Sequence, residues 1–197
     1  PKKYIAGPDV NTGEREMQWF AEATGDWRST TGKPADFCVE AKSGKKCGLP
    51  HELGSTGFGV AKSTEVAARL LGLNIKGATC AIHGFGNVAT FAFKFLTEMG
   101  VKVVALADSK NAIFDKNGLD KTLIQKLISE KKRLSEYPQA NQIEAHDFWS
   151  LEVDILIPAS VTDVINQSNK DKISAKIIVE GANIPMREEI EEEFFKK

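Results

Sequence analysis

The stretch Ala78-Thr79-Cys80-Ala81-Ile82-His83 runs directly into Gly84-Phe85-Gly86-Asn87-Val88-Ala89, and this junction decides the fold. A short apolar run of this kind is typical of a strand buried in a sheet. The second half has the pattern Gly-x-Gly-x-x-Ala, in which the first glycine permits a tight turn, the second lets the backbone approach a pyrophosphate, and the alanine lets a helix pack close to the strand. The junction therefore predicts a strand, a phosphate-binding turn and the start of a helix.

The residues after this turn complete a βαβ unit. Apolar side chains recur at helical spacing from Val88 to Met99, and Gly100 stands where a helix commonly ends. The residues from 101 to 107 form a second apolar run, which closes on Asp108. A strand, a helix and a strand within about 30 residues constitute a βαβ unit.

The same alternation extends to both sides of this unit. We expect helices over 56–71, 119–134 and 162–169, strands over 153–157 and 176–179, and a charged helix from 188 to 197. Apolar strands that alternate with helices are typical of a mostly parallel sheet covered by helices on both faces. The predicted fold class is therefore doubly wound α/β, with a Rossmann dinucleotide-binding domain.

The N-terminal part follows a different pattern. Asn11 or Thr12 is a good N-cap for a helix that ends near Ala23, and Glu14 and Glu16 place carboxylates in its first turn. Residues 24–55 are rich in Gly, Pro, Ser, Thr and Lys, so we expect a long ordered loop or short irregular elements there.

The composition excludes several classes of partner. Twenty-six basic and twenty-seven acidic side chains give a net charge of -1, so no overall field draws the chain to nucleic acid or to an anionic membrane. No apolar run approaches the roughly 18 residues that span a bilayer, and the N-terminus lacks a signal-peptide pattern. We expect a cytoplasmic protein with neither nucleic-acid nor membrane partners.

The three cysteines, Cys38, Cys47 and Cys80, are odd in number and sparse for a chain of 197 residues. This usage predicts reduced thiols rather than a disulfide-stapled secreted domain. Cys38, Cys47 and His51 do not have the spacing of a structural zinc site, and a fourth ligand is not evident. We therefore predict no metal site.

The glycine-rich turn predicts a dinucleotide site. The first N–H groups of the following helix and the positive end of its dipole favour an anion. This argument assigns cofactor binding to the turn and the first helical residues: Gly84, Phe85, Gly86, Asn87 and Val88. The alternative is a glycine turn that serves only tight packing between strand and helix.

Asp108 follows Gly84 by 24 residues, at the end of the second strand. An acidic side chain there accepts hydrogen bonds from the adenosine ribose, which favours NAD. Ser109 and Lys110 come next, and a hydroxyl with an ammonium suits a 2′-phosphate, so NADP stays open. Asp108 also has an alternative role as a turn residue that caps the strand end.

Six motifs, in order along nearly the whole chain, together resemble the glutamate dehydrogenase family. They are Gly7-Pro8-Asp9-Val10-Asn11-Thr12, Thr31-Gly32-Lys33-Pro34, Ser55-Thr56-Gly57-Phe58-Gly59-Val60, Gly84-Phe85-Gly86-Asn87-Val88-Ala89, Asp108-Ser109-Lys110 and Glu180-Gly181-Ala182-Asn183. The leucine and phenylalanine dehydrogenases share the architecture but are less similar in spacing.

The resemblance implies the oxidative deamination of L-glutamate to 2-oxoglutarate and ammonia, and its reverse, with hydride transfer to or from NAD or NADP. Asp9 matches the family's catalytic aspartate, a carboxylate that both gives and takes a proton; by itself it reads as a helix cap. Thr56 matches the threonine that binds the nicotinamide carboxamide, and Asn183 matches an asparagine near the nicotinamide ribose. Ala159 and Ser160 match a loop beside the cofactor.

The chain also departs from the family pattern. The catalytic and substrate-binding lysines of the family would precede Pro1, and a substrate-contacting serine would follow Lys197. The residues from Gly48 to Gly54 differ from the usual Gly-Gly-Ser-x-Gly-Arg segment, with Glu52 in place of the arginine. The stretch 184–187, Ile-Pro-Met-Arg, replaces the commoner Pro-Thr-Thr.

We therefore expect a piece of an enzyme cut at both ends. Residues 1–24 are interpreted as a hinge segment and a helix left from the boundary of the substrate domain. Residues 25–197 are interpreted as the dinucleotide-binding domain, truncated at its C-terminus. Cofactor binding without turnover is expected for this piece.

Two other functions stay open at this point. One is a non-catalytic NAD(P)-binding regulatory module, in keeping with the missing lysines and the altered 48–54 loop. The other is a different Rossmann enzyme, either another amino-acid dehydrogenase or one similar to malic enzyme. Because members of the family are usually hexamers that assemble through the absent N-terminal domain, we expect a homo-oligomer for the full-length protein and a monomer or weak dimer for this piece.

Overall fold

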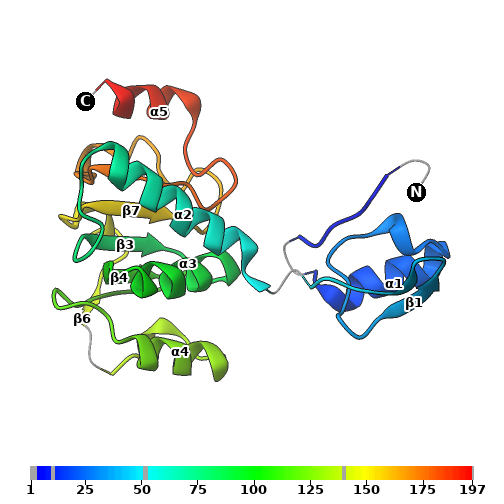
Figure 1. Cartoon of the computed structure of the whole chain (residues 1–197). Coiled ribbons are helices and arrows are strands. Elements are labelled where there is room, and N and C mark those ends of the chain that lie inside the picture. Colours follow the sequence, from blue (N-terminus) through cyan, green and yellow to red (C-terminus); the bar gives the residue numbers. More distant parts are fainter. Residues whose placement is uncertain (1–3, 10–11, 51–52, 139–140, 197) are drawn as a thin grey trace. The chain divides into compact units, whose positions relative to one another are not determined.

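The computed structural model describes residues 4–9, 12–50, 53–138 and 141–196. By its internal contacts the chain divides into two compact units, Pro1–Ser55 and Thr56–Lys197 (Figure 1). This division lies later in the chain than the predicted boundary at residues 24 and 25, and the roles assigned to the two parts stay predictions. Among the described residues, no helix is both long and apolar enough to cross a bilayer.

The first unit combines a helix with a small hairpin. It contains α1 (Glu14–Thr24), the 3-10 turn η1 (Trp27–Ser29) and the antiparallel strands β1 (Cys38–Ala41) and β2 (Gly44–Cys47). The predicted helix is present. A carboxylate of its acidic first turn stabilises the start of the helix, because Glu16 accepts a 2.8 Å hydrogen bond from the backbone N–H of Gly13. The hairpin was not predicted, because most of its residues are exposed and show no apolar alternation.

The predicted N-cap of α1 is wrong. Gly13, not Thr12, occupies the cap position. Thr12 instead closes a turn with Asp9, in which the Thr12 hydroxyl donates to the Asp9 carbonyl over 2.9 Å and accepts from the Asp9 amide over 2.7 Å. Asn11, the other predicted cap, lies outside the described residues.

The expectation of reduced thiols is wrong for two of the three cysteines. Cys38 and Cys47 are directly opposite each other in the β1–β2 ladder and form a disulfide. Their pairing depends on the hairpin register, which cysteine number and spacing along the chain do not reveal. The bond also removes both sulfurs from the metal cluster weighed above, and His51 lies outside the described residues. Cys80 is a free, buried thiol, and burial raises its pKa.

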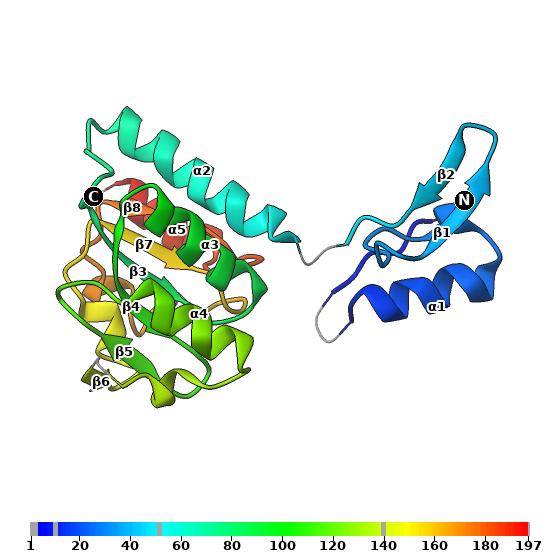
Figure 2. The same cartoon turned by 60° about the horizontal axis from the view of Figure 1, so that its bottom comes forward.

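The second unit contains a six-stranded sheet within its described residues, in the order β6-β5-β4-β3-β7-β8. The strands β3, β4, β7 and β8 are parallel, whereas β5 and β6 are antiparallel to their neighbours. Figure 2 shows β6 and β8 at opposite edges. The bounds are β3 (Thr79–His83), β4 (Lys102–Ala107), β5 (Ala112–Phe114), β6 (Asn141–Ile143), β7 (Ile155–Pro158) and β8 (Ile177–Ile178). The four parallel strands were predicted, and the two antiparallel ones were not.

The helices of this unit largely follow the hydrophobic periodicity. They are α2 (Ser55–Leu70), α3 (Asn87–Glu98), α4 (Lys121–Ser129) and α5 (Glu188–Phe195), with 3-10 turns η3 (Leu134–Glu136), η4 (Phe148–Ser150) and η5 (Lys170–Lys172). The predicted helix over 119–134 is shorter than expected, because α4 ends at Ser129 and only Leu134 of the remaining residues lies in the separate turn η3.

The predicted helix over 162–169 is wrong. The side chain of Asn169 accepts a 2.8 Å hydrogen bond from the Asn166 amide and donates one of 2.8 Å to the Val164 carbonyl. Such bonds offer the backbone an alternative to helical pairing. Asp163, with φ of 57°, is also outside the helical region. The segment therefore forms consecutive turns.

Both faces of the sheet are covered, as predicted for a doubly wound fold. The helices α2, α3 and α4 pack on one face, over residues such as Ile82 and Leu106. The turn η4 and helix α5 cover the other face, over residues such as Ala81 and Leu156. In β4 the register shifts where Cys80 pairs with Val103 but Ala81 pairs with Ala105, so that Val104 and Ala105 both belong to the second layer.

Helices α2 and α3 lie side by side in both views (Figures 1 and 2). They approach so closely that only glycine fits at position 57. A Cβ there would lie 2.5 Å from the Cβ of Phe91 and 2.8 Å from the carbonyl oxygen of Val88. The contact places the first turn of α2 beside the first turn of α3, next to the glycine-rich turn.

This contact yields a matched test of stability. We expect Gly57→Ala to lower the free energy of unfolding by about 1–3 kcal/mol, because the added methyl group must force the two helices apart. Gly59 lies on the same helix, but a Cβ there would meet no atom within 4 Å. Gly59→Ala should therefore raise the free energy of unfolding by up to about 1 kcal/mol through helix propensity alone. Equal shifts of the two variants in chemical denaturation would contradict the close packing.

Candidate functional site

The first glycine of the turn is required by packing. Gly84 is buried and has a φ of +144°, and a Cβ on it would lie 2.4 Å from the carbonyl oxygen of Ala159. Its amide donates a 2.8 Å hydrogen bond to the carbonyl of Ala107. The turn is thus held between the ends of β4 and β7, and any side chain at position 84 would separate them.

The second glycine of the turn is not required by packing. Gly86 is exposed, its backbone is extended, and a Cβ on it would meet no atom within 4 Å. It is the N-cap residue of α3, and no side chain caps this helix, whereas the side chain of Asp120 caps α4 through the Leu123 amide over 2.9 Å. The start of α3 therefore presents backbone N–H groups without a side-chain acceptor, the arrangement that binds anions.

A second loop forms the other wall of this region. Ala159 and Ser160 follow β7, and the Ala159 amide donates to the His83 carbonyl over 2.8 Å. A Cβ on Gly181 would lie 2.9 Å from the Cβ of Ala159 and 3.3 Å from Cγ1 of Val88. The loop after β8 therefore approaches both the loop after β7 and the first turn of α3.

The altered stretch 184–187 is fixed to the loop after β7. The amide of Asp163 donates to the Ile184 carbonyl over 3.0 Å, and the guanidinium of Arg187 pairs with the Asp163 carboxylate at 2.6 Å. Ile184 has a φ of +48°, which is uncommon for a β-branched residue. The carbonyl of Asn183 accepts a 3.0 Å bond from the Thr162 hydroxyl. The two loops thus form one rim around the glycine-rich turn.

Asp108 is engaged in its own turn. Its Oδ1 accepts hydrogen bonds from the amides of Lys110 and Asn111, at 2.8 and 2.7 Å. Its Oδ2 is 3.4 Å from the Leu134 amide. The turn role is therefore visible in the structure, while a ribose contact stays a prediction. Ser109 and Lys110 are exposed at the same edge of the sheet.

The second unit therefore brings most of the predicted site residues to one edge, where the parallel strands end. The loops after β3, β4, β7 and β8 carry these residues, and Thr56 is linked to them because its neighbour Gly57 contacts Val88. The residues concerned are Gly84, Phe85, Gly86, Asn87, Val88, Asp108, Ser109, Lys110, Ala159, Ser160 and Asn183. Asp9 belongs to the first unit and is not among them.

His83 is a residue of this edge that the sequence motifs missed. Its ring stacks on Trp149 at 4.6 Å and meets the edge of Phe148 at 5.2 Å. Its Nδ1 is 2.7 Å from the hydroxyl of Ser160. Burial lowers the pKa of His83 to about 4, so the ring is neutral near pH 7. A histidine directly before the glycine motif was the available signal, but its partners lie far along the chain.

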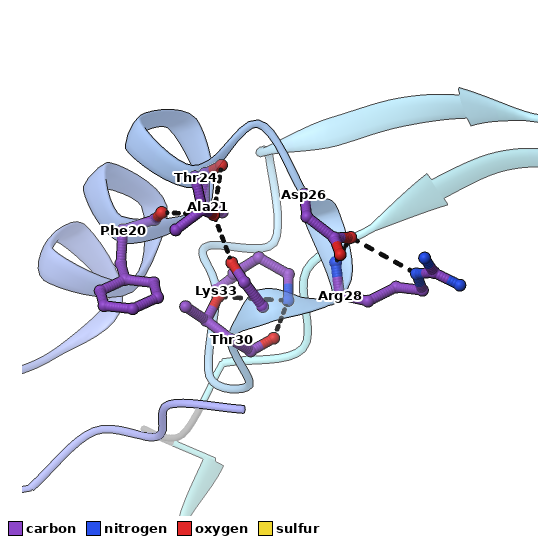
Figure 3. Close-up of polar contacts among 8 residues, drawn as sticks. Phe20, Ala21, Thr24, Asp26, Arg28, Thr30 and Lys33 are labelled. Carbon is purple, nitrogen blue, oxygen red and sulfur yellow. Dashed lines mark hydrogen bonds and ion pairs between the residues drawn. The ribbon is translucent and has the colours of Figure 1, made fainter. Parts of the chain in front are cut away.

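In the first unit, a buried lysine supports the segment that carries Asp9. Lys33 is 6% exposed, and its Nζ donates to both the carbonyl and the hydroxyl of Thr30 (Figure 3). The ammonium also lies 4.6 Å from the centre of the Trp27 ring. Burial lowers the pKa of Lys33.

The residues around Thr30 connect this lysine to the N-terminal segment. The amide of Ala6 donates to the Ser29 carbonyl over 2.8 Å, and the amide of Thr31 donates to the Ala6 carbonyl over 2.9 Å. Ala6 lies three residues before Asp9, which is exposed. On its other side Thr30 donates from its hydroxyl to the Met17 carbonyl of α1 over 3.2 Å. Lys33 thus stabilises the residue that joins α1 to the segment with Asp9.

The family of glutamate/leucine/phenylalanine/valine dehydrogenases matches residues 48–197. The chain belongs to this family. It is 38% identical over 98% of its length to the glutamate dehydrogenase of Aeropyrum pernix, 35% over 95% to the NADP-specific glutamate dehydrogenase of Saccharolobus shibatae, and 32% over 98% to the NAD-specific glutamate dehydrogenase of Clostridioides difficile. The resemblance inferred from the six motifs is confirmed.

A solved structure of the family confirms the fold. The hetero-hexameric glutamate dehydrogenase from Thermus thermophilus matches 98% of this chain with a TM-score of 0.80 at 23% identity. The chain spans less than half the length of the relatives it matches, since it covers 44–46% of each.

The half-buried His83 makes the stability of this dehydrogenase-family domain sensitive to acid. The unfolded chain protonates His83 near its ordinary pKa of about 6.5, whereas the folded chain does so at about 4. Between these values the unfolded state binds more protons, so stability falls as the pH is lowered from about 6.5 to 4, by up to about 3 kcal/mol. Denaturation at a series of pH values should show a flatter profile for His83→Asn. The control is His146→Asn, at a surface histidine beside Asp147, and equal profiles for wild type and His83→Asn would contradict the assignment.

The buried lysine yields a test in the first unit. Lys33→Met keeps the apolar stem but leaves the Thr30 carbonyl without its donor, which costs about 1–3 kcal/mol. We expect the amides of Ala6 and Thr31 to exchange with solvent at least about tenfold faster in this variant, as measured by NMR. Lys45→Met, at an exposed lysine of β2, is the control. Unchanged exchange in Lys33→Met would show that the lysine does not support this pairing.

Proposed function

We propose that this chain is the coenzyme-binding part of an NAD(P)-dependent glutamate dehydrogenase. The main observation in support of this proposal is the contrast between the two glycines of the turn. Gly84 is fixed by contact with Ala159, but Gly86 is exposed and contacts nothing that requires a glycine. A glycine turn that serves only packing does not need the second glycine, whereas a pyrophosphate that approaches the uncapped start of α3 does.

The residues at this edge form two groups, one for each half of a bound dinucleotide. The amides of the first turn of α3 would hold the pyrophosphate. Asp108, Ser109 and Lys110 follow β4 and would face the adenosine ribose, while Ala159, Ser160 and Asn183 on the opposite loops would face the nicotinamide half, with Thr56 at its carboxamide. The bond between His83 and Ser160 orients that hydroxyl.

The proposed reaction is the oxidative deamination of L-glutamate. The α-carbon loses a hydride and the nitrogen loses a proton, and water then replaces the nitrogen, which gives 2-oxoglutarate and ammonia. The bound nicotinamide supplies the hydride acceptor. Asp9 would take and return the protons at the amino group and at the attacking water, since a carboxylate serves as both base and acid.

We expect the preference for NAD or NADP to depend on three residues after β4, namely Asp108, Ser109 and Lys110. The Oδ1 atom of Asp108 accepts from the amides of Lys110 and Asn111, and Oδ2 accepts one longer bond, of 3.4 Å, from the Leu134 amide. A ribose hydroxyl would bind at Oδ2, which has a second lone pair. Lys110 supplies a positive charge for a 2′-phosphate. The relatives include both an NAD-specific and an NADP-specific enzyme, so both nucleotides belong in the experiment.

The whole protein is proposed to act as an oligomer. The Thermus thermophilus relative is described as hetero-hexameric.

The family's substrate-binding lysines have no match in this chain. We therefore expect the chain alone to bind the coenzyme without turning over L-glutamate.

Fluorescence titrations with NADH and NADPH test the proposal. Saturable binding is expected, and Gly86→Val should weaken it at least about tenfold, because the side chain would fill the approach to the pyrophosphate. Since Gly86 is exposed and faces open space, the variant should keep its circular dichroism, and its free energy of unfolding should fall by no more than about 1 kcal/mol, through the poorer N-cap. If Lys110 binds the 2′-phosphate, Lys110→Ala should weaken the binding of NADPH more than the binding of NADH. Unchanged affinity in Gly86→Val would overturn the site, and glutamate-dependent reduction of NAD(P) by the chain alone would overturn the expectation of no turnover.

A further inference from the structure

The Cys38–Cys47 disulfide lies at the open end of the β1–β2 hairpin, where solvent reaches it. Cys47 is exposed and Cys38 is half-buried. The chain has one other cysteine, Cys80, which is buried in the second unit. Exposed disulfides are more easily reduced than buried ones and are often labile or regulatory. A thiol in solution therefore meets this disulfide far more readily than it meets Cys80.

The disulfide is the main constraint on the hairpin. Among the described residues β1 and β2 form a two-stranded sheet with no third strand (Figure 2), and every residue of β2 is exposed. An isolated two-stranded hairpin is at best marginally stable in water. The bond joins residues nine positions apart, and a cross-link over a loop of this size favours the closed form on the order of a hundredfold. Opening the bond should therefore let the two strands separate.

The residue after Cys47 connects the hairpin to the turn that contains Lys33. A Cβ on Gly48 would lie 2.0 Å from the carbonyl oxygen of Pro34 and 2.5 Å from that of Lys33, so the backbones are in direct contact. The Gly48 amide donates to the Phe37 carbonyl over 3.0 Å, and the Phe37 amide donates to the Pro34 carbonyl over 3.2 Å. Gly48 is thus placed by the hairpin, and it in turn fixes this turn.

Trp27 contacts the same turn. Its ring lies 5.1 Å from the Phe37 ring and 4.6 Å from Nζ of Lys33. Phe37 directly precedes β1, so a change in the hairpin reaches the ring that lies beside the ammonium of Lys33. The orientation of the buried lysine therefore depends on contacts at the open end of the hairpin.

The contacts of Lys33 continue to the N-terminal segment. Its ammonium donates to the carbonyl and the hydroxyl of Thr30 (Figure 3). The amide of the next residue, Thr31, donates to the Ala6 carbonyl over 2.9 Å. Ala6 lies three residues before Asp9. A continuous series of contacts therefore joins the disulfide to the segment that carries Asp9.

We propose that the Cys38–Cys47 bond exchanges reversibly with thiols in solution, and that its oxidation state sets the order of the segment that carries Asp9. When the bond is closed, the hairpin holds Gly48 against the turn at Lys33. When the bond is open, the strands separate and this contact is lost. The switch depends on contacts within the first unit alone, while its effect on catalysis through Asp9 rests on the proposed function.

The exchange takes place in two steps. A thiol loses its proton to water, and its thiolate attacks Sγ of Cys47, the more exposed sulfur. The Cys38–Cys47 bond breaks, and its electron pair leaves with Sγ of Cys38, which takes a proton from water. A second thiolate then attacks the sulfur of the bound thiol and releases Cys47, which is protonated in the same way. Two external thiols are thereby oxidised to one disulfide, and the protein disulfide is reduced to two thiols.

Mass spectrometry and amide exchange of the 197-residue chain test the proposal, with reduced glutathione as the probe. The first mixed disulfide should form at Cys47. In the reduced chain the Gly48 amide should exchange at least about tenfold faster than in the oxidised chain, and the amides of Ala6 and Thr31 at least about threefold faster. The amide of Ala21 in α1 should change less than about twofold, because the helix keeps its own hydrogen bonds.

Cysteine variants separate the redox effect from other effects of the reductant. The double variant Cys38→Ser/Cys47→Ser should exchange like the reduced wild type and should not respond to glutathione. Cys80→Ala removes the buried thiol of the second unit and should respond as the wild type does.

Two further variants test the route through Gly48. Gly48→Ala should give fast exchange at Ala6 and Thr31 even with the disulfide closed, because the added Cβ forces the backbone away from Pro34. Ser43→Ala, at the exposed tip of the hairpin, should exchange as the wild type does. Because none of these measurements uses a coenzyme, they stay informative if the chain binds none.

Three outcomes would overturn the inference. The first is a disulfide that glutathione does not reduce while the chain stays folded. The second is unchanged exchange at Ala6 and Thr31 in the reduced chain, which would confine the effect of the bond to the hairpin. The third is an equal loss of protection at Ala21, which would make the bond a staple for the whole first unit rather than a switch for one segment.

Discussion

The arrangement of the second unit depends on the convergence of three strand ends at Gly84. The carbonyl oxygen of Ala159 would lie 2.4 Å from a Cβ at this position, and the Gly84 amide is bonded to Ala107 at the end of β4. The strands β4, β3 and β7 therefore terminate at one level only because residue 84 has no side chain. The start of α3, the loop after β7 and the loop after β8 are all placed by this contact, and they contain most of the candidate site.

Local sequence patterns predicted the features that local chemistry controls. The run from Thr79 to Met99 specifies a buried strand, a glycine turn and an amphipathic helix within a few residues of each other, and the structure agrees. The strands β5 and β6 have three residues each and are stabilised by pairing with distant residues. Their own sequences therefore carry too little periodicity to identify them. The pairing of Cys38 with Cys47 is similar, because it depends on the register of a hairpin with mostly exposed residues.

The candidate site also combines features that local motifs predict with features that depend on distant residues. Gly84 to Val88 follow from a motif, but the contact between His83 and Ser160 joins residues 77 positions apart. Trp149, which stacks on His83, belongs to a 3-10 turn that the hydrophobic periodicity of the sequence did not predict. Asp108 directly follows β4, as the sequence predicted, but its engagement by the amides of Lys110 and Asn111 depends on the conformation of the turn. Motifs thus locate the backbone that would face a ligand, whereas tertiary packing determines how its side chains are oriented.

The short strand β8 and the candidate site are linked by a short piece of chain. Only two residues of β8 pair with β7, yet the strand leads directly into Gly181 and Asn183. Gly181 is held by the Pro158 carbonyl over 2.9 Å and packs on Ala159. A two-residue strand at an edge is a weak anchor for such a loop, because few ladder hydrogen bonds hold it. The loop that carries Asn183 is therefore held mainly through Gly181, by its bond to the Pro158 carbonyl and by its contact with Ala159.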